Sequence, residues 1–169
     1  MWANEFVERT MLNVILTMPC CGKSYLHNLN TKYFDLDIFN NQKTVGQKKV
    51  ALKMLKYFAL NCDESCVYLL NICTYRNLML FNDKNILVKE IIIPKDLDFR
   101  CQAYCNRDLE DFGVVRIKGL ELFKKKYGID TEYGQSLARK LGIKLTWLKD
   151  GNFLSDYLLD KKEVVTDFL

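Results

Sequence analysis

The sequence contains a single histidine and two prolines among its 169 residues, and it has no long hydrophobic run. No apolar stretch approaches the roughly 20 residues that a membrane-spanning helix needs. The N-terminus also lacks the basic and then apolar pattern of a signal peptide. We therefore expect a cytoplasmic protein that makes no membrane contact. Because His27 is the only histidine, hydrolases built on Ser-His-Asp or Cys-His groups are disfavoured.

The composition is that of one globular domain covering residues 1–169. Hydrophobic residues make up 49% of the chain and charged residues 27%, so the chain has enough apolar side chains for a core and is not disordered. The net charge of +4 suits a polyanionic ligand such as a nucleotide but does not demand nucleic acid.

Cysteine usage indicates a reducing compartment. The chain has seven cysteines, an odd number, and without a signal peptide we expect reduced thiols rather than a disulfide framework. A zinc site is an alternative, because Cys62 and Cys66 are separated by three residues, as are Cys101 and Cys105. Neither pair has the tight C-x-x-C spacing of a structural zinc site.

The most informative stretch is Leu12–Tyr25, LNVILTMPCCGKSY. Its first six residues predict a strand, and the loop that follows leads through Gly22, Lys23 and Ser24 into a helix. Gly22 has no side chain and lets backbone approach a phosphate closely. The start of a helix attracts an anion, Lys23 adds a positive charge, and Ser24 offers an oxygen of the kind that Mg²⁺ prefers. The alternative is an ordinary strand-to-helix turn with a surface lysine.

This stretch resembles the phosphate-binding loop of the P-loop NTPases, whose pattern is G-x-x-x-x-G-K-[ST]. Thr17 stands at the first glycine position, and Cys20 and Cys21 stand where a further glycine is often found. The resemblance implies that ATP or GTP binds at this loop with Mg²⁺, and that Ser24 is a metal ligand. The nucleotide-binding residues that it implies are Pro19, Cys20, Cys21, Gly22, Lys23, Ser24 and Tyr25.

A second predicted strand, Lys32–Leu36, ends in two acidic residues, Asp35 and Asp37. In open α/β sheets, ligands lie beyond the carboxyl ends of the strands, where these carboxylates would be placed. The phosphate loop followed by an acidic strand end is similar to small P-loop kinases that act on nucleoside monophosphates or polynucleotides. That resemblance implies that Asp35 or Asp37 contacts the acceptor or supports Mg²⁺. A solvated turn with an aspartate cap is the alternative.

The apolar run Cys66–Cys73 predicts a buried central strand, where P-loop proteins usually place an acidic residue that supports Mg²⁺. This strand ends without an acid, so direct metal ligation here is in doubt. Asn71 or Thr74 could act through water. Arg76 follows, and could reach a phosphate or cap the next helix.

The segment 95–111 predicts a polar helix that carries Arg100 and Arg107 on one face, because seven residues make two helical turns. In small P-loop kinases a lid supplies arginines to the phosphates, and the planar guanidinium suits that role. We therefore expect a helical, lid-like segment here. The alternative is that both arginines form salt bridges with nearby acids, which are Asp96, Asp98, Asp108 and Glu110.

The rest of the chain alternates helices and strands, which predicts an α/β fold with a parallel sheet of about five strands between helices. Strand order 2-3-1-4-5 is implied by the kinase resemblance. Gly128 and Gly142 are expected to end separate helices, and the turn Lys149–Asn152 is a candidate for the adenine contact. The remaining predicted helices are Trp2–Thr10, Gly22–Asn30, Thr44–Leu60, Tyr75–Phe81, Val114–Tyr127, Thr131–Leu141 and Phe153–Leu159, and the remaining strands are Asn85–Ile93 and Lys144–Leu148.

Together these features favour an ATP-dependent phosphotransferase. Lys23, Asp35, Asp37, Arg100 and Arg107 would be its catalytic residues, and its acceptor would be a nucleoside, a nucleotide or the 5′ end of a polynucleotide. The alternative is a nucleotide-binding regulatory or interaction module that transfers no phosphate, which the missing first glycine and the missing strand-end acid favour. The sequence leaves the acceptor, the base preference and the oligomeric state open.

Overall fold

The structure, a computed structural model, describes residues 12–39, 53, 57, 66–79 and 86–159. The expected helix Trp2–Thr10 and nearly all of the expected helix Thr44–Leu60 lie outside these residues. Among the described helices, none combines the length and the apolar character needed to cross a bilayer.

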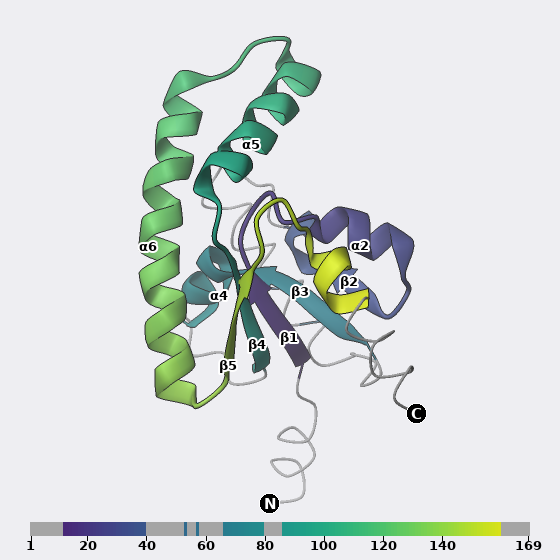
Figure 1. The fold of residues 1–169 in the computed structure, drawn as a ribbon. Coiled ribbons are helices and arrows are strands. Elements are labelled where there is room, and N and C mark those ends of the chain that lie inside the picture. The colour runs from purple at the N-terminus through teal and green to yellow at the C-terminus, as the bar shows by residue number, and fades with distance from the viewer. Residues whose placement is uncertain (1–11, 40–52, 54–56, 58–65, 80–85, 160–169) are drawn as a thin grey trace, which may run out of the picture.

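Five parallel strands form one sheet in the order β2-β3-β1-β4-β5, as the kinase resemblance implied (Figure 1). The predicted α/β class and strand order are therefore confirmed. The strands are β1 Leu12–Thr17, β2 Tyr33–Asp35, β3 Val67–Asn71, β4 Ile86–Pro94 and β5 Lys144–Leu148.

The three inner strands are apolar because both of their faces are covered by other parts of the chain. In β1, Leu12, Val14 and Leu16 are buried, and β4 ends in the buried run Ile91–Ile93. β4 carries the charged pair Lys89 and Glu90 and lies between β1 and the edge strand β5. The buried Glu90 carboxylate is accommodated because it accepts hydrogen bonds from the hydroxyls of Thr146 and Tyr157.

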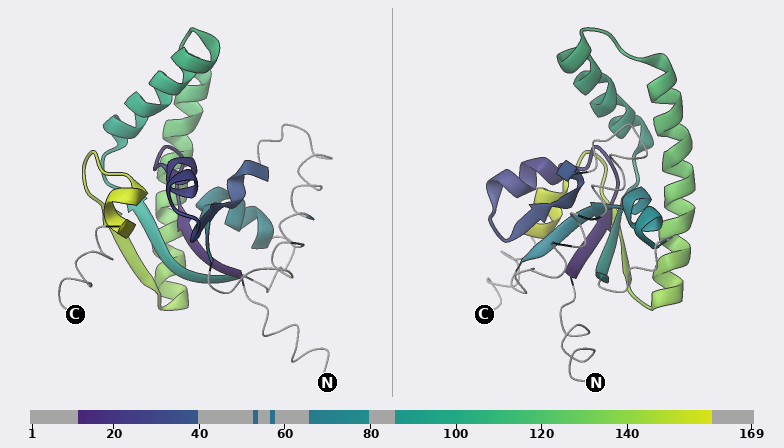
Figure 2. Two further views of the ribbon diagram at one scale, coloured as in Figure 1. Left: turned by 90° about the vertical axis from the view of Figure 1, so that its right-hand side faces the viewer. Right: turned by 180° about the vertical axis from the view of Figure 1, so that it is seen from behind.

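Helices cover both faces of the sheet (Figures 1 and 2). On one face lie α4 (Ile72–Met79) and α6 (Ile117–Leu141), which contact each other. On the other face lie α2 (Lys23–Leu29) and the last described helix, 154–159. A short 3₁₀ helix, η1 (Leu36–Phe39), follows β2.

Helix α6 is one continuous helix of 25 residues, so the prediction that Gly128 ends a helix was wrong. A glycine inside a helix costs only about 1 kcal/mol relative to alanine. That cost is offset because residues on both sides of Gly128, including Phe123 and Leu137, are buried against the rest of the protein. Gly142 ends α6 as expected, with a left-handed φ of 63°.

The end of β3 also differs from the prediction. The strand stops at Asn71 and α4 starts at Ile72, within the run Cys66–Cys73 that was expected to be entirely extended. The run is apolar because both a central strand and the first turn of a packed helix are buried there. Sequence apolarity cannot separate the two.

Helix α5 (Leu97–Phe112) matches the helix expected over 95–111. With the first part of α6 it forms a hairpin that rises beyond the carboxyl ends of the strands (Figure 2). This hairpin places α5 beside the loop that follows β1, which is the region of the candidate site.

Candidate functional site

The loop between β1 and α2 contains two residues in the left-handed region, Cys20 with φ of 64° and Gly22 with φ of 85°. Cys21 between them does not have a positive φ. Alternation of backbone handedness turns successive N–H groups toward a common point and forms an anion-binding concavity. Glycine adopts this conformation freely, whereas at Cys20 it must be held by surrounding contacts.

Arg100 supplies those contacts from α5. Its side chain is fully buried, and its guanidinium donates hydrogen bonds to the backbone oxygens of Cys20, over 3.2 Å, and Asn152. It also lies 3.2 Å from a carboxylate oxygen of Asp96. The Phe153 ring packs on the same guanidinium, 5.2 Å away. The predicted ion pair with Asp96 is thus present, and Arg100 lies beneath the loop.

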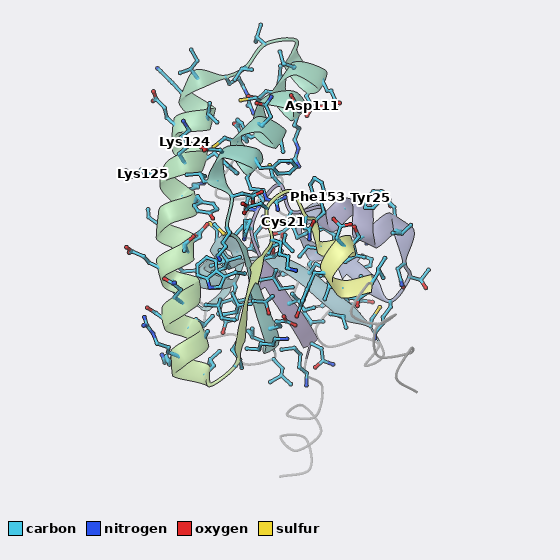
Figure 3. All side chains as sticks on the ribbon, in the orientation of Figure 1. Cys21, Tyr25, Asp111, Lys124, Lys125 and Phe153 are labelled. Atoms are coloured by element: carbon cyan, nitrogen blue, oxygen red, sulfur yellow. The ribbon has the colours of Figure 1, made fainter. Side chains whose placement is uncertain are left out.

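The segment after β5 closes the loop from the other side. Leu154 donates its backbone N–H to the Cys21 oxygen over 2.9 Å, and Phe153 lies against Gly22. Figure 3 shows Cys21 and Phe153 close together where these two segments meet. The shape of the loop is therefore fixed by contacts from α5 and from the segment after β5.

Lys23 follows the loop at the start of α2, and its side chain is almost buried, with 8% exposed. Its ammonium group donates a hydrogen bond to the side-chain oxygen of Asn71 over 2.6 Å. The same nitrogen lies 3.8 Å from a carboxylate oxygen of Asp37. The lysine therefore connects the loop with the ends of β2 and β3, and its charge faces a polar enclosure rather than bulk water.

The two predicted acids lie together at the end of β2. The Ser24 hydroxyl donates a hydrogen bond to Asp35 over 3.1 Å, and the Asp37 backbone N–H donates to the other oxygen of the Asp35 carboxylate over 3.0 Å. The N–H of Asp35 in turn donates to the His27 ring over 3.0 Å. His27 thus fixes the backbone at the end of β2.

Asp37 is held from β3 and α4. It accepts hydrogen bonds from the Asn71 backbone N–H over 2.7 Å and from the Thr74 hydroxyl over 2.8 Å. Burial raises the pKa of its carboxyl group above the usual value, and the charge of Lys23 partly opposes that rise. The result is an oriented carboxylate at the end of β3, where P-loop proteins usually carry an acid in the strand itself.

These residues line one open cavity of about 340 Å³, which we call the phosphate cavity. It includes eight of the predicted site residues from the loop and the acidic strand end, together with Arg107 from α5. Cys21 and Arg100 are not among its lining residues, because both side chains are fully buried below it. The lining residues are Pro19, Cys20, Gly22, Lys23, Ser24, Tyr25, Asp35, Asp37, Asn71 and Arg107.

A second cavity, of about 180 Å³, adjoins the first and shares Pro19 and Asn71 with it. We call it the ring cavity. Its other walls come from Met18, from the start of α4 and from α6, which contributes Phe123, Lys126, Tyr127 and Asp130. Sequence analysis did not assign these residues of α6 to a site, because their spacing is that of any amphipathic helix. A buried acid such as Asp130 within such a helix was the only available signal.

The chemistry of the phosphate cavity also suits a metal ion. Mg²⁺ takes oxygen ligands and keeps several waters, so a hydroxyl and one or two carboxylates are sufficient protein ligands. Ser24, Asp35 and Asp37 meet that requirement, because all three line this cavity. The zinc alternative receives no support from the described residues, which contain no cluster of three histidine, cysteine or acidic side chains suited to a metal. Cys62, one of its four cysteines, lies outside them.

Arg76 is placed away from the phosphate cavity. Its guanidinium lies 3.4 Å from Asp130 and 5.7 Å from the centre of the Tyr133 ring. Arg76 therefore pairs with a residue of α6 and does not line the phosphate cavity, where a phosphate contact was one of its two expected roles. The six cysteines of the described residues form no disulfide.

Comparison with known proteins identifies no family for this chain. The sequence matches no protein-family model, and a search of curated proteins gives no match either.

Proposed function

We propose that the chain is a Mg²⁺-dependent phosphotransferase that binds ATP or GTP in the phosphate cavity. One observation carries this proposal. The loop with positive φ at Cys20 and Gly22 lines the same cavity as the Lys23 ammonium and the carboxylates of Asp35 and Asp37. A polyanion needs backbone N–H groups and a cation, and its Mg²⁺ needs oxygen ligands. Phosphoryl transfer depends mainly on positioning and electrostatics, so few further groups are required.

In this proposal Lys23 moves its hydrogen bond from Asn71 to the outer phosphates. Ser24 and Asp35 would hold Mg²⁺ directly or through water, and the ion would supply positive charge opposite the charge that develops on the phosphates. Arg107 is exposed on α5 at the cavity rim, from where its guanidinium can reach the transferred group. Arg100 positions the loop and does not touch the nucleotide.

Asp37 is the candidate base for the acceptor. The oxygen of an acceptor hydroxyl forms a bond to the γ-phosphorus, and the bond from that phosphorus to the β-phosphate oxygen breaks. The hydroxyl proton passes to the Asp37 carboxylate, from which it is lost to solvent. The raised pKa of Asp37 favours this role, because a more basic carboxylate accepts a proton more readily.

The test is an assay of ADP and phosphorylated product with Mg-ATP and a panel of nucleosides, monosaccharides, nucleotides and 5′-hydroxyl oligonucleotides. We expect product with at least one acceptor, and we expect Asp37→Asn to lower turnover by about 10²-fold or more while Mg-ATP still binds. Asp111→Asn is the matched control, because Asp111 is exposed on the outer part of α5 (Figure 3). Equal turnover in wild type and Asp37→Asn would reject the assignment of the base.

A nucleotide-binding module without phosphate transfer is the second candidate. It is favoured by the amide of Asn71 at the end of β3, where an acid is usual, and by the hydrogen bond that ties Lys23 to it. If Mg-ATP binds tightly but no acceptor of the panel gives a product, the nucleotide-binding module is the candidate that remains.

A further inference from the structure

The ring cavity lies next to the phosphate cavity, and its size limits what it can hold. Its volume is about 180 Å³. For comparison, an apolar cavity of about 150 Å³ holds one benzene molecule. The ring cavity therefore accommodates a single ring with a few substituents, and a two-ring purine is too large for it.

The walls of the ring cavity combine aromatic surface with one deeply buried acid. Phe123 and Tyr127 come from successive turns of α6 and present rings, which suit the flat face of a heterocycle or the C–H face of a sugar. Asp130, one turn further, is only 3% exposed. Its Oδ1 atom accepts no hydrogen bond from any described residue, and its ion pair with Arg76 is 3.4 Å long. A buried oxygen in this state calls for an O–H or N–H donor.

We propose that the ring cavity binds one ring of the acceptor of the phosphotransfer reaction, and that this acceptor is an uncharged molecule whose O–H or N–H group on that ring donates a hydrogen bond to Asp130. The proposal rests on the function proposed above and narrows its acceptor class. A free monosaccharide shares the required chemistry, and so does a pyrimidine nucleoside that places its pyrimidine ring in this cavity and its ribose toward the phosphate cavity. Purine nucleosides and acceptors that already carry a phosphate do not.

The connection between the two cavities supports this assignment. Thr74 lines the ring cavity and donates its hydroxyl hydrogen to Asp37, which lines the phosphate cavity, over 2.8 Å. The candidate base therefore stands at the boundary, where a hydroxyl of a molecule seated on the Phe123 and Tyr127 rings would meet it. Lys126 also lines the ring cavity, but it is exposed to solvent, whereas Asp130 is buried. An acceptor phosphate placed beside Asp130 would therefore still meet a like charge at the buried end of the cavity.

The decisive experiment measures ring binding without any nucleotide, so that its result does not depend on phosphate transfer. Uridine, cytidine, D-ribose and D-glucose are titrated into the full chain and followed by NMR, with uridine monophosphate and adenosine as comparison ligands. The variants are Asp130→Asn, which keeps the side-chain shape, and Phe123→Leu, which removes a ring but keeps an apolar side chain. Lys125→Ala is the matched control, since Lys125 lies on the outer side of α6 (Figure 3).

We expect at least one of the four uncharged rings to bind, and to bind better than uridine monophosphate and adenosine. Asp130→Asn removes a hydrogen bond to a charged group, so we expect it to bind the ring at least about tenfold more weakly than the wild type. If Asp130→Asn does not fold, weaker ring binding in Phe123→Leu still locates the ligand in the ring cavity. Lys125→Ala should bind the ring as the wild type does. Comparison of uridine and cytidine with D-ribose and D-glucose shows whether the bound ring is a pyrimidine or a sugar.

Two results would overturn the proposal: binding of none of the four rings, or tighter binding of uridine monophosphate than of uridine. Unchanged ring affinity in both Asp130→Asn and Phe123→Leu would overturn it as well. A separate titration of the wild-type chain and of Lys23→Ala with Mg-ATP decides the proposed function, because Lys23→Ala should weaken nucleotide binding about tenfold or more, whereas the ring titration is made without nucleotide. The failure of one proposal is therefore distinguishable from the failure of the other.

Discussion

The buried Arg100 donates a hydrogen bond to the backbone oxygen of Cys20, 80 positions earlier in the chain, over 3.2 Å. Cys20 has a left-handed backbone, which is costly for a residue with a side chain. The contact from Arg100 helps to hold that conformation and connects the loop with α5. The shape of the loop is thus maintained by a residue that does not line the phosphate cavity.

Replacing Arg100 should therefore destabilise the fold. Arg100→Lys removes the planar guanidinium, which donates hydrogen bonds to the backbone oxygens of both Cys20 and Asn152. It also weakens the ion pair with Asp96. We expect the free energy of unfolding in urea to fall by about 1–3 kcal/mol, as when a buried hydrogen-bond acceptor loses its donor. Arg107→Lys on the exposed side of α5 should change it by less than about 0.5 kcal/mol. Equal small effects in both variants would contradict the structural role of Arg100.

The raised pKa of Asp37 predicts how stability changes with pH. A carboxyl group whose pKa is higher in the folded state binds more protons when folded. Its contribution to stability is greatest below the pKa of the unfolded chain and is lost as the pH rises through the folded pKa. Asp37→Asn removes this loss, so its stability relative to wild type should increase as the pH rises above the ordinary aspartate pKa of about 4.

Urea unfolding at a series of pH values measures this difference. Asp111→Asn, at an exposed position, should show a stability difference from wild type that does not change with pH in the same way. A difference for Asp37→Asn that is constant or shrinks with rising pH would mean that burial does not raise the pKa of Asp37.

Gly22 combines a left-handed φ of 85° with a crowded surrounding, since a Cβ atom there would lie 3.2 Å from the Cβ of Phe153. Gly22→Ala should cost about 1–2 kcal/mol for the backbone alone and should also weaken nucleotide binding. Gly113→Ala is the matched control, because Gly113 has φ of 73° but open space around it. Thermal unfolding should show the larger loss for Gly22→Ala, and an equal loss in both variants would contradict the contact with Phe153.

Two glycines of α6 test its continuity. A Cβ at Gly128 meets no atom within 4 Å, so Gly128→Ala should stabilise a continuous helix by about 0.5–1 kcal/mol. A Cβ at Gly134 would lie 3.0 Å from Ile93 and 3.1 Å from Ile72, so Gly134→Ala should destabilise by about 1–3 kcal/mol. Unfolding in urea gives both values. Loss of stability in Gly128→Ala would favour two separate helices that meet at Gly128.

Much of the fold was predictable because local patterns carry it. The apolar run Leu12–Thr17 gave β1, and Gly142 marked the end of α6. Predictions went wrong where tertiary packing decided the outcome. Gly128 continues a helix because the residues around it are buried, and β3 gives way to α4 within one apolar run.

The candidate site divides in the same way. Lys23 and Ser24 could be identified because their spacing after a strand has a local meaning. The long-range contacts could not, because the hydrogen bond from Lys23 to Asn71 joins residues 48 positions apart. Asp130 and the rings beside it were also missed, since α6 meets the ends of β1 and β3 only in the folded chain.

The account depends most directly on whether the loop of Cys20 and Gly22 with Lys23 binds a nucleoside triphosphate. Calorimetric titration of the full chain with Mg²⁺ and a non-hydrolysable ATP analogue measures this binding. We predict saturable binding to wild type, unchanged binding in Lys125→Ala, and binding about tenfold or more weaker in a folded Lys23→Ala variant. Absence of binding to the wild-type chain, or equal affinity in wild type and Lys23→Ala, would contradict the account.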